Sequence, residues 1–163
     1  MNELNQRVLE LLCQDCRMPV SRIAVMLGVS EEEVACAIQG MEDDRVIVQY
    51  RPVVDWDQTQ KTFVEAMISV KVTPQRDQGF DAIAKRIGGF EEVRSVFLMS
   101  GAYDLLLLLE APTLRELAYF VSEKLSTLDT VTATSTSFVL KRYKQDGVIF
   151  GQKMEDQRLV ISP

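Results

Sequence analysis

Few residues in this chain could carry out acid–base, nucleophilic or metal chemistry, because the sequence contains no histidine. Its absence excludes Ser-His-Asp and Cys-His catalysis, histidine general acid–base chemistry and zinc sites that need an imidazole. Cys13 and Cys16 form a C-x-x-C pair, but a zinc site needs four ligands and Cys36 is the remaining cysteine. We therefore predict three small buried thiols, no metal, no cofactor and no enzymatic activity.

The charged residues are divided unevenly along the chain. Residues 1–60 hold 5 Lys and Arg against 11 Asp and Glu, whereas residues 61–163 hold 13 of each. The whole net charge of −6 therefore comes from the first part. This division predicts two modules, 1–60 and 61–163, and indicates that the first does not bind polyanions indiscriminately.

Features of export and membrane insertion are lacking in the sequence. The chain starts without a basic and apolar signal, and its longest strongly apolar run, Leu105 to Leu109, is far shorter than the ~20 residues that cross a bilayer. An odd number of cysteines fits free thiols in a reducing compartment. We expect a cytoplasmic protein that is not bound to a membrane.

Three segments at the start of the chain have apolar residues at helical spacing. Residues 3–14 predict an amphipathic helix, and residues 20–27 predict a second helix that Gly28 ends in a left-handed conformation. Residues 30–33, Ser-Glu-Glu-Glu, form a capping box that begins a third helix. Its predicted buried residues are Val34, Ala35, Ile38 and Met41. Three helices with a tight turn before the last predict a helix-turn-helix, the alternative being a small helical bundle.

The third helix would be the recognition helix, although its first turn carries three glutamates. Acidic residues stabilise a helix N-terminus by about 0.3 to 1 kcal/mol each, so their role here is structural. We expect DNA binding to be salt-sensitive and assisted by several subunits. The candidate DNA-binding residues are Arg17, Arg22, Ser30, Glu31, Gln39, Arg45 and Arg51.

A linker follows the three helices. Residues 46–54 are rich in β-branched residues and predict a strand, and the polar, turn-like segment 55–62 places the domain boundary near residue 60. We expect Trp56 to anchor this junction rather than to bind a ligand.

Beyond the linker, a β-α-β pattern occurs twice. The predicted strands are 63–72, 93–100, 103–110 and 132–140, and the predicted helices are 80–87 and 113–128. Two successive units of this kind predict a ferredoxin-like βαββαβ sandwich with both helices on one face of an antiparallel sheet. The fold class is therefore α+β: an N-terminal helix-turn-helix (winged-helix-like) domain followed by this sandwich.

The five leucines at 105–109 make one strand apolar on both faces, whereas helices can cover only one. We predict that a second copy of the chain covers the other face in a sheet-to-sheet homodimer, which Leu107→Glu would break. The alternative cover is the apolar run Leu159, Val160 and Ile161 of the same chain.

Several motifs together resemble the Lrp/AsnC (feast/famine) transcriptional regulators over essentially the whole chain. They are Leu-Gly-Val-Ser at 27–30, the linking strand, and Met-Ser-Gly-Ala-Tyr-Asp at 99–104, with segments 138–144 and 158–163 resembling one branch of the family. The resemblance implies an N-terminal domain that binds double-stranded DNA. It also implies a C-terminal domain that senses amino acids and assembles homodimers into tetramers or octamers.

An effector pocket near the loop at 100–104 is a further implication of the resemblance. Gly101 would let backbone N–H groups approach a ligand carboxylate, and Asp104 would pair with an ammonium; alternatively, Gly101 makes a tight hairpin that Asp104 caps. The candidate effector-binding residues are Ser100, Gly101, Tyr103, Asp104, Thr134 and Thr136.

Two departures from the family pattern affect the expected function. Ala37 and Gly40 stand where family recognition helices typically carry basic residues, and Arg45 replaces the glycine that follows this helix. We predict a DNA-binding transcriptional regulator modulated by a small-molecule effector, an amino acid being the expected one. The alternative is an effector-binding or scaffold protein whose acidic helix-turn-helix has lost DNA binding and contacts a protein partner.

Overall fold

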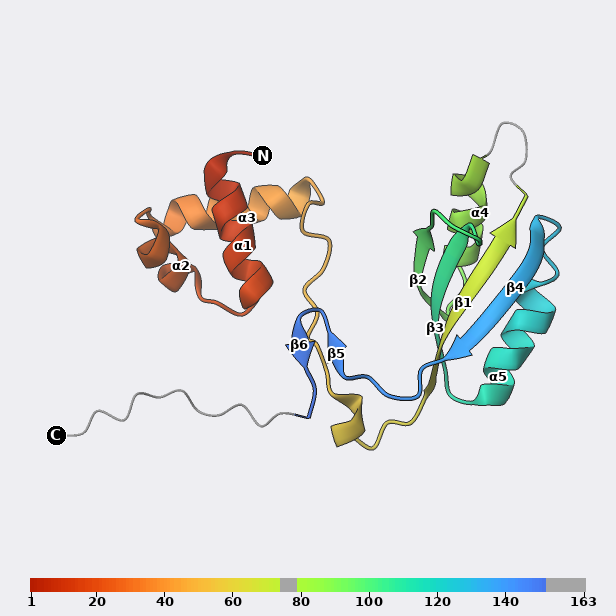
Figure 1. The fold of residues 1–163 in the computed structure, drawn as a ribbon. Coiled ribbons are helices and arrows are strands. Elements are labelled where there is room, and N and C mark those ends of the chain that lie inside the picture. Colours follow the sequence, from red (N-terminus) through yellow and green to blue (C-terminus); the bar gives the residue numbers. More distant parts are fainter. Residues whose placement is uncertain (74–78, 152–163) are drawn as a thin grey trace. The chain divides into compact units, whose positions relative to one another are not determined.

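The computed structural model describes residues 1–73 and 79–151 (Figure 1). Contacts divide the chain into two compact units, Met1–Pro52 and Val53–Pro163. Residues 53–60, which the sequence analysis assigned to the first module, fall in the second unit. There the Trp56 ring packs edge to face on Phe63, with 5.9 Å between centroids. The C-terminal motif at 158–163, with the apolar run considered as a cover for the sheet, lies outside the described residues.

The first unit contains the three predicted helices, α1 (Glu3–Gln14), α2 (Val20–Leu27) and α3 (Glu31–Asp43). Their apolar faces meet in one core. Its buried members are Val8, Leu12, Ile23, Ala24, Val34, Ala37 and Met41. The prediction for α3 was wrong at one residue, since Ala35 is exposed and Ala37, at 8% exposed, is buried in its place. Ala37 therefore faces the core and not the surface where DNA would bind.

Two helices of this unit end in the same backbone arrangement. Gly28 follows α2 with φ 70°, and the Val29 N–H donates to the Ala24 carbonyl at 3.1 Å. Arg45 lies just beyond α3 with φ 55°, and the Val46 N–H donates to the Met41 carbonyl at 2.8 Å. Both are left-handed helix ends of the kind that glycine favours, and one of them holds an arginine.

The predicted strand at 46–54 is wrong, because none of its residues is assigned to a strand. An extended segment becomes a strand only when its backbone N–H and C=O groups pair with a neighbour, and residues 46–54 form no ladder with any segment that the structure describes. Val46, Val48, Tyr50 and Val53 are all large apolar side chains that stay exposed.

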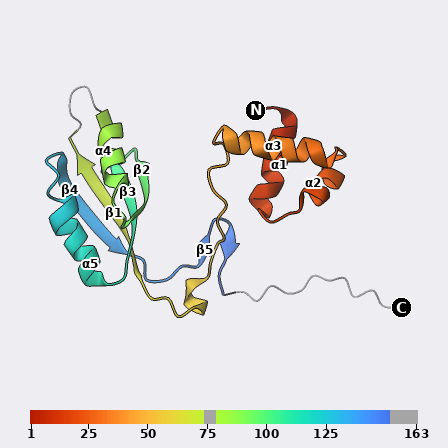
Figure 2. The same ribbon diagram turned by 180° about the vertical axis from the view of Figure 1, so that it is seen from behind.

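The second unit is the predicted ferredoxin-like fold (Figures 1 and 2). Its strands pair in the order β2-β3-β1-β4, every pair antiparallel. The strands are β1 (Val64–Val72), β2 (Val93–Leu98), β3 (Leu105–Ala111) and β4 (Val131–Phe138). Helices α4 (Gly79–Gly88) and α5 (Leu114–Tyr119) lie on one face of this sheet, and the short η1 (Trp56–Gln58) precedes β1. A small hairpin of β5 (Lys144–Gln145) and β6 (Val148–Ile149) follows β4.

The helix predicted over 113–128 forms in two parts. Thr113 caps α5 by accepting a hydrogen bond from the Glu116 N–H at 3.2 Å, as the capping box predicts. The chain then continues as a π-helix, η2 (Phe120–Leu125), whose turn is one residue wider. This wider turn lets both Phe120 and Leu125, each 0% exposed, point into the core.

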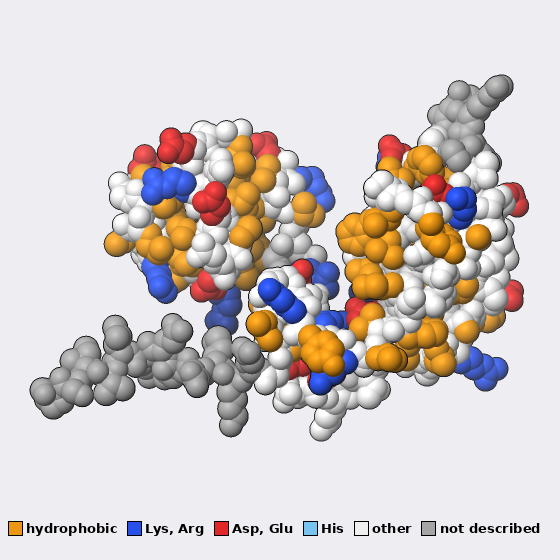
Figure 3. Space-filling view, viewed as in Figure 1, with side chains coloured by type: hydrophobic (Ala, Val, Ile, Leu, Met, Phe, Trp, Pro, Cys, Tyr) orange, Lys and Arg blue, Asp and Glu red, His pale blue; other side chains and the backbone are white. Residues whose placement is uncertain are grey.

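The leucine run of β3 alternates between the two faces of the sheet. Leu105, Leu107 and Leu109 are 0% exposed beneath the helices, whereas Leu106 and Leu108 lie on the opposite, open face and are half-buried. In Figure 3, hydrophobic side chains gather over the β2 side of the sheet, where Phe97 is 47% exposed. The sequence analysis therefore chose the wrong test residue: Leu107 belongs to the core, and a second copy would meet Leu106 and Leu108.

All three cysteines are exposed, so the prediction of buried thiols was wrong. Cys36 lies between the core positions Val34 and Ala37 and therefore faces outward, because side chains three or four apart share a helix face. Cys16 lies in the turn beyond the end of α1. No group of three or more His, Cys, Asp or Glu residues in the described part of the chain is placed to hold a metal ion.

Candidate effector and DNA-binding sites

The loop between β2 and β3 is held by backbone bonds at its ends and by one side chain. The Met99 N–H donates to the Asp104 carbonyl at 2.8 Å, and the Asp104 N–H donates to the Val70 carbonyl at 3.0 Å. The Asp104 carboxylate also accepts a hydrogen bond from the Val72 N–H at 2.8 Å. The Asp104 side chain therefore caps the end of β1 and not the β2–β3 hairpin, and within the described residues its other carboxylate oxygen accepts no hydrogen bond.

Gly101 lies in the exposed part of this loop. The φ of Gly101 is not positive, and a Cβ placed on this residue would meet no atom within 4 Å. The hairpin itself therefore does not require a glycine at this position. Because glycine has no side chain, a ligand can approach the neighbouring backbone N–H groups without obstruction.

Lys71 is a residue of this site that the sequence analysis missed. Its Nζ donates to the Ala102 carbonyl at 3.1 Å and so ties the loop to β1. Lys71 is exposed and lies two positions beyond Ser69, which is on the open face of the sheet. Since side chains two apart in a strand share a face, Lys71 is also on the open face. A lysine beside an aspartate gives the loop one cation and one anion.

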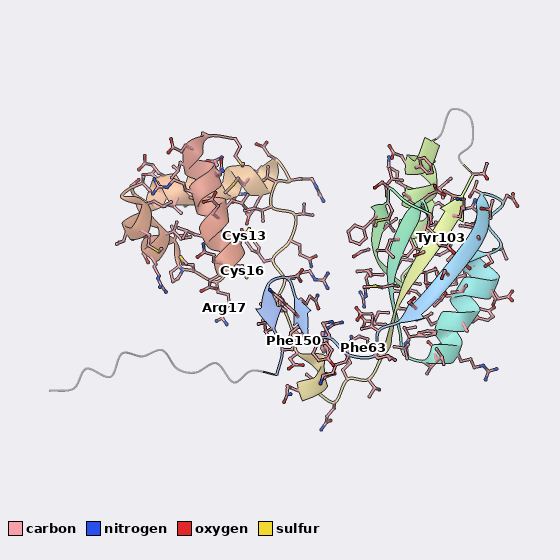
Figure 4. The ribbon with its side chains drawn as sticks, viewed as in Figure 1. Cys13, Cys16, Arg17, Phe63, Tyr103 and Phe150 are labelled. Atoms are coloured by element: carbon pink, nitrogen blue, oxygen red, sulfur yellow. The ribbon has the colours of Figure 1, made fainter. Side chains whose placement is uncertain are left out.

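The structure separates the predicted effector residues into two groups. Ser100, Gly101, Tyr103 and Asp104 lie together in the loop, and Figure 4 shows Tyr103 at that end of the sheet. Thr134 and Thr136 are opposite Val70 and Ile68 in the β1–β4 pairing. Because opposed residues share a face, both threonines lie on the face that the helices cover. Thr134 is in the same cross-strand row as Leu105, next to the loop, and Thr136 is one row further away.

The start of α3 is a complete capping box. The Ser30 N–H donates to Glu33 Oε2 at 2.9 Å, and the Glu33 N–H donates to the Ser30 hydroxyl oxygen at 3.2 Å. The bond from the Ser30 N–H, and then a second one that the Ser30 hydroxyl donates to the same Glu33 oxygen at 2.7 Å, lower the pKa of Glu33 below its ordinary value. Ser30 and Glu33 therefore fix the helix start, which leaves Glu31 and Glu32 as the free acidic residues of the first turn.

All seven predicted DNA-binding residues are exposed in the first unit. They are Arg17, Arg22, Ser30, Glu31, Gln39, Arg45 and Arg51. Figure 4 shows Arg17 with Cys13 and Cys16 at the C-terminal end of α1. Gln39 Nε2 donates to Asp43 Oδ1 at 3.0 Å along the exposed side of α3. The arginines therefore belong to other segments of the unit, since α3 itself carries no Lys or Arg.

Ion pairs occupy the end of the open sheet face that lies away from the loop. Glu110 on β3 pairs with Lys61 Nζ at 2.8 Å and with Arg94 Nε at 3.1 Å. Burial acts to raise the pKa of Glu110, but the two cations outweigh it and the net direction is downward. Glu65, opposite Glu110 on β1, pairs with Arg142 at 2.5 Å. These pairs place a cation beside each of two adjacent carboxylates on the same face of the sheet as the apolar Leu106 and Leu108.

A helix-turn-helix unit joined to a ferredoxin-like unit with an accessible polar loop defines a class of ligand-binding regulators of transcription. Comparison with known proteins gives the same class. The sequence matches the AsnC-type helix-turn-helix domain over residues 1–42 and the Lrp/AsnC ligand binding domain over residues 65–149. The chain belongs to the Lrp/AsnC family of transcriptional regulators.

A relative from Bacillus subtilis, the uncharacterized HTH-type transcriptional regulator YugG, is 44% identical over 164 residues, which cover 100% of this chain and 99% of YugG. The fold is shared with the Mycobacterium tuberculosis leucine response regulatory protein LrpA (TM-score 0.72, 19% identity, 90% of this chain and 97% of that one). It is also shared with a Neisseria meningitidis transcriptional regulator solved as an L-Met complex (TM-score 0.70, 21% identity, 89% and 93%). Among the described residues, no helix is long and apolar enough to cross a membrane.

Proposed function

We propose that this chain is a cytoplasmic regulator, and not an enzyme, that binds its own upstream DNA and changes its affinity when an amino acid binds at the Ser100–Asp104 loop. The observation that carries the proposal is the loop itself. Gly101 leaves its backbone open to approach, and the Asp104 carboxylate has one oxygen beyond the one bonded to the Val72 N–H. The Neisseria meningitidis relative, whose structure contains L-Met, supports an amino acid as the ligand class.

In this proposal, the ammonium of the amino acid pairs with Asp104 and its carboxylate accepts from the backbone N–H groups beside Gly101. Lys71 holds the loop through the Ala102 carbonyl and adds a positive charge near that carboxylate. Ser100 and Tyr103 supply hydroxyl groups from the same loop. Thr134 and Thr136 lie on the face of the sheet that the helices cover, opposite to the face of Lys71, so this proposal assigns them no contact with the amino acid.

The DNA-binding part of the proposal rests on the exposed arginines around α3. With no cation on α3, contacts to phosphate come from Arg17, Arg22, Arg45 and Arg51, and Gln39 is the residue of α3 placed to read a base edge. A single unit carrying so few cations binds DNA weakly, so several subunits must act together. The open face of the sheet, with Leu106 and Leu108, is where we propose that two copies join into a dimer that assembles further to a tetramer or octamer.

The test is fluorescence anisotropy of the full chain on its own upstream DNA and on a scrambled duplex, at about 50 and 200 mM salt. We expect tighter binding to its own DNA, a steep loss at higher salt, and a shift in affinity when a mixture of amino acids is added. Equal binding to both duplexes at both salt concentrations, with and without amino acids, would refute the proposal.

Two substitutions at Asp104 separate its roles as cap and as ligand. Asp104→Asn keeps an oxygen that accepts from the Val72 N–H but removes the charge, so the fold should persist while the response to amino acids is lost. Asp104→Ala removes both and should also lower stability by about 1 to 3 kcal/mol, because the Val72 N–H is left without its partner. An Asn variant that still responds fully would show that the carboxylate does not bind the ammonium.

A further inference from the structure

The C-x-x-C pair of Cys13 and Cys16 has no role in the proposed function. Cys13 is the second-to-last residue of α1, and Cys16 lies in the turn that follows. Both side chains are exposed, and Figure 4 shows them together at the end of α1. Exposed thiols are open to oxidants in solution, and C-x-x-C is the spacing at which two cysteines open and close a disulfide.

Hydrogen bonds fix the turn that carries the two cysteines. The Asp15 N–H donates to the Leu11 carbonyl at 3.0 Å, and the Met18 N–H donates to the Asp15 carbonyl at 3.0 Å. The Arg17 N–H also donates to Asp15 Oδ1 at 2.9 Å. Asp15 therefore holds the backbone on both sides of Cys16.

The backbone between the two cysteines has the shape that a disulfide needs. Gln14 is the last helical residue, and Asp15 is extended, with φ −148° and ψ 97°. A helical residue followed by an extended one forms a turn whose first and fourth Cα atoms lie within about 7 Å of each other. A disulfide needs Cα atoms about 4.4 to 6.8 Å apart, so this turn can close one between residues 13 and 16.

Cys16 is also close to residues of two other segments. The Tyr50 hydroxyl donates to Glu42 Oε1, on α3, at 2.9 Å. Burial raises the pKa of Tyr50, Glu42 raises it further, and the negative charge of the Cys16 thiolate adds to both, which places Cys16 near Tyr50. A movement of Cys16 therefore affects the contact between Tyr50 and α3, and also Arg17, the next residue and a proposed phosphate contact.

A redox role fits this pair better than a metal role. A zinc site needs four ligands, and no group of three or more His, Cys, Asp or Glu residues in the described part of the chain is placed to hold a metal ion. Cys36, exposed on α3, is therefore not part of such a group with the pair. Two thiols without further ligands are sufficient for a disulfide.

We propose that Cys13 and Cys16 form a dithiol that hydrogen peroxide oxidises to an intramolecular disulfide and that a small thiol reduces again. One cysteine, as its thiolate, attacks a peroxide oxygen; the O–O bond breaks, the sulfur becomes a sulfenic acid, and the departing hydroxide takes up the proton that the thiol released. The other sulfur attacks this sulfur, the S–S bond forms, and the S–O bond breaks with loss of water. Two thiols and one peroxide give one disulfide and two waters, with two electrons passing from sulfur to the peroxide.

The consequence for DNA binding rests on the proposed function. Closing the disulfide draws Cys16 toward Cys13 and shifts Arg17, the residue that follows it. The affinity of the oxidised chain for its upstream DNA is then about twofold to fivefold lower, because one exposed phosphate contact is displaced. In a reducing compartment such a disulfide is transient, which is the behaviour of a redox sensor.

The experiment treats the full reduced chain with a small molar excess of hydrogen peroxide, alkylates the thiols that remain, and digests the chain with trypsin. Both cysteines of the pair fall in one peptide, residues 8–17, which contains no methionine for the peroxide to oxidise, and Cys36 falls in residues 23–45. Mass spectrometry should find peptide 8–17 lighter by two hydrogen atoms and not alkylated, and Cys36 alkylated. Dithiothreitol should restore alkylation of the pair.

Variants test whether the pair acts as a unit. Cys36→Ser is the matched control, an exposed cysteine of the same helical unit, and should leave the oxidation of peptide 8–17 unchanged. Cys13→Ser and Cys16→Ser should each prevent the loss of two hydrogens. Unmodified thiols, sulfinic acid at a single cysteine, or disulfides only between chains would overturn the inference, and none of these results bears on the proposed function, since no DNA is present.

Fluorescence anisotropy on the upstream DNA then compares the reduced, oxidised and re-reduced chain. We expect a reversible fall in affinity that Cys16→Ser does not show. A disulfide that forms without changing the affinity would overturn the regulatory part of the inference. A reduced chain that binds no DNA would refute the proposed function, while the disulfide found by mass spectrometry would still support the dithiol.

Discussion

Arg45 stands at a helix end where the backbone conformation favours glycine, and replacing it should make the first unit more stable. Its φ of 55° is in the left-handed region, which costs a residue with a Cβ about 1 to 2 kcal/mol. Glycine gives back about 0.4 to 1 kcal/mol because it gains freedom in the unfolded chain. We therefore expect Arg45→Gly to raise the free energy of unfolding by about 0.5 to 1 kcal/mol.

Gly28 offers the matched reverse experiment. It has φ 70° at the end of α2, and a Cβ there would meet no atom within 4 Å, so Gly28→Arg introduces backbone strain without a steric clash. It should lower stability by about the amount that Arg45→Gly raises it. Arg45→Asn is a second control, because asparagine tolerates this conformation better than arginine and removes the same charge.

The assay is hydrogen exchange of the amides of α1 and α3 in the full chain, with thermal unfolding followed by circular dichroism. A change of 0.5 to 1 kcal/mol moves the midpoint of a unit this small by about 2 to 8 °C. If Arg45 is also a phosphate contact, as proposed, Arg45→Gly should bind the upstream DNA more weakly while being more stable. An Arg45→Gly variant that is no more stable, together with a Gly28→Arg variant that is no less stable, would refute the reasoning.

The remaining predictions concern the sheet unit. Leu108→Glu should reduce the assembled size measured by light scattering without unfolding the chain, because Leu108 lies on the open face; an unchanged size would argue against the sheet-to-sheet dimer. Leu107→Ala should lower stability by about 2 to 5 kcal/mol in a denaturant titration, since Leu107 is 0% exposed in the core, and a loss below 1 kcal/mol would contradict that burial. Glu110→Gln should destabilise the chain at pH 7, with the difference from the parent shrinking as the pH falls below about 4.5. Burial raises the pKa of Glu110, but Lys61 and Arg94 outweigh it and hold this pKa below its ordinary value, so the stabilising charge is lost on acidification. If the difference in stability between Glu110→Gln and the parent did not depend on pH, the ion pairs would not be its cause.

Local signals in the sequence correctly predicted most elements of the fold. The capping box at Ser30, the C-terminal Gly28 and the cap at Thr113 all act over three or four residues, so they can be recognised without knowing the tertiary structure. The same holds for the two β-α-β patterns. The strand predicted at 46–54 failed because its residues have a suitable composition but no partner strand in the described part of the chain, and pairing is not a local property.

The loop at 100–104, where we propose that the effector binds, shows where sequence reasoning stopped. It located Ser100 to Asp104 through a motif, but it could not place Lys71 beside Ala102, because 31 residues separate them in the sequence. Nor could it tell that Thr134 and Thr136 lie on the face covered by helices, since that depends on their register against Val70 and Ile68. A shift of one residue in that register would move both to the open face.

The sequence by itself determined the class of this protein: a helix-turn-helix unit, a ferredoxin-like unit and the family to which they belong, through local helix signals and short motifs. Tertiary structure alone decided which leucines of β3 are core and which are open, that the three cysteines are exposed, and that Lys71 reaches the loop before β3. The physical reason is that burial and pairing depend on residues far apart in the chain, whereas helix formation and capping depend on neighbours.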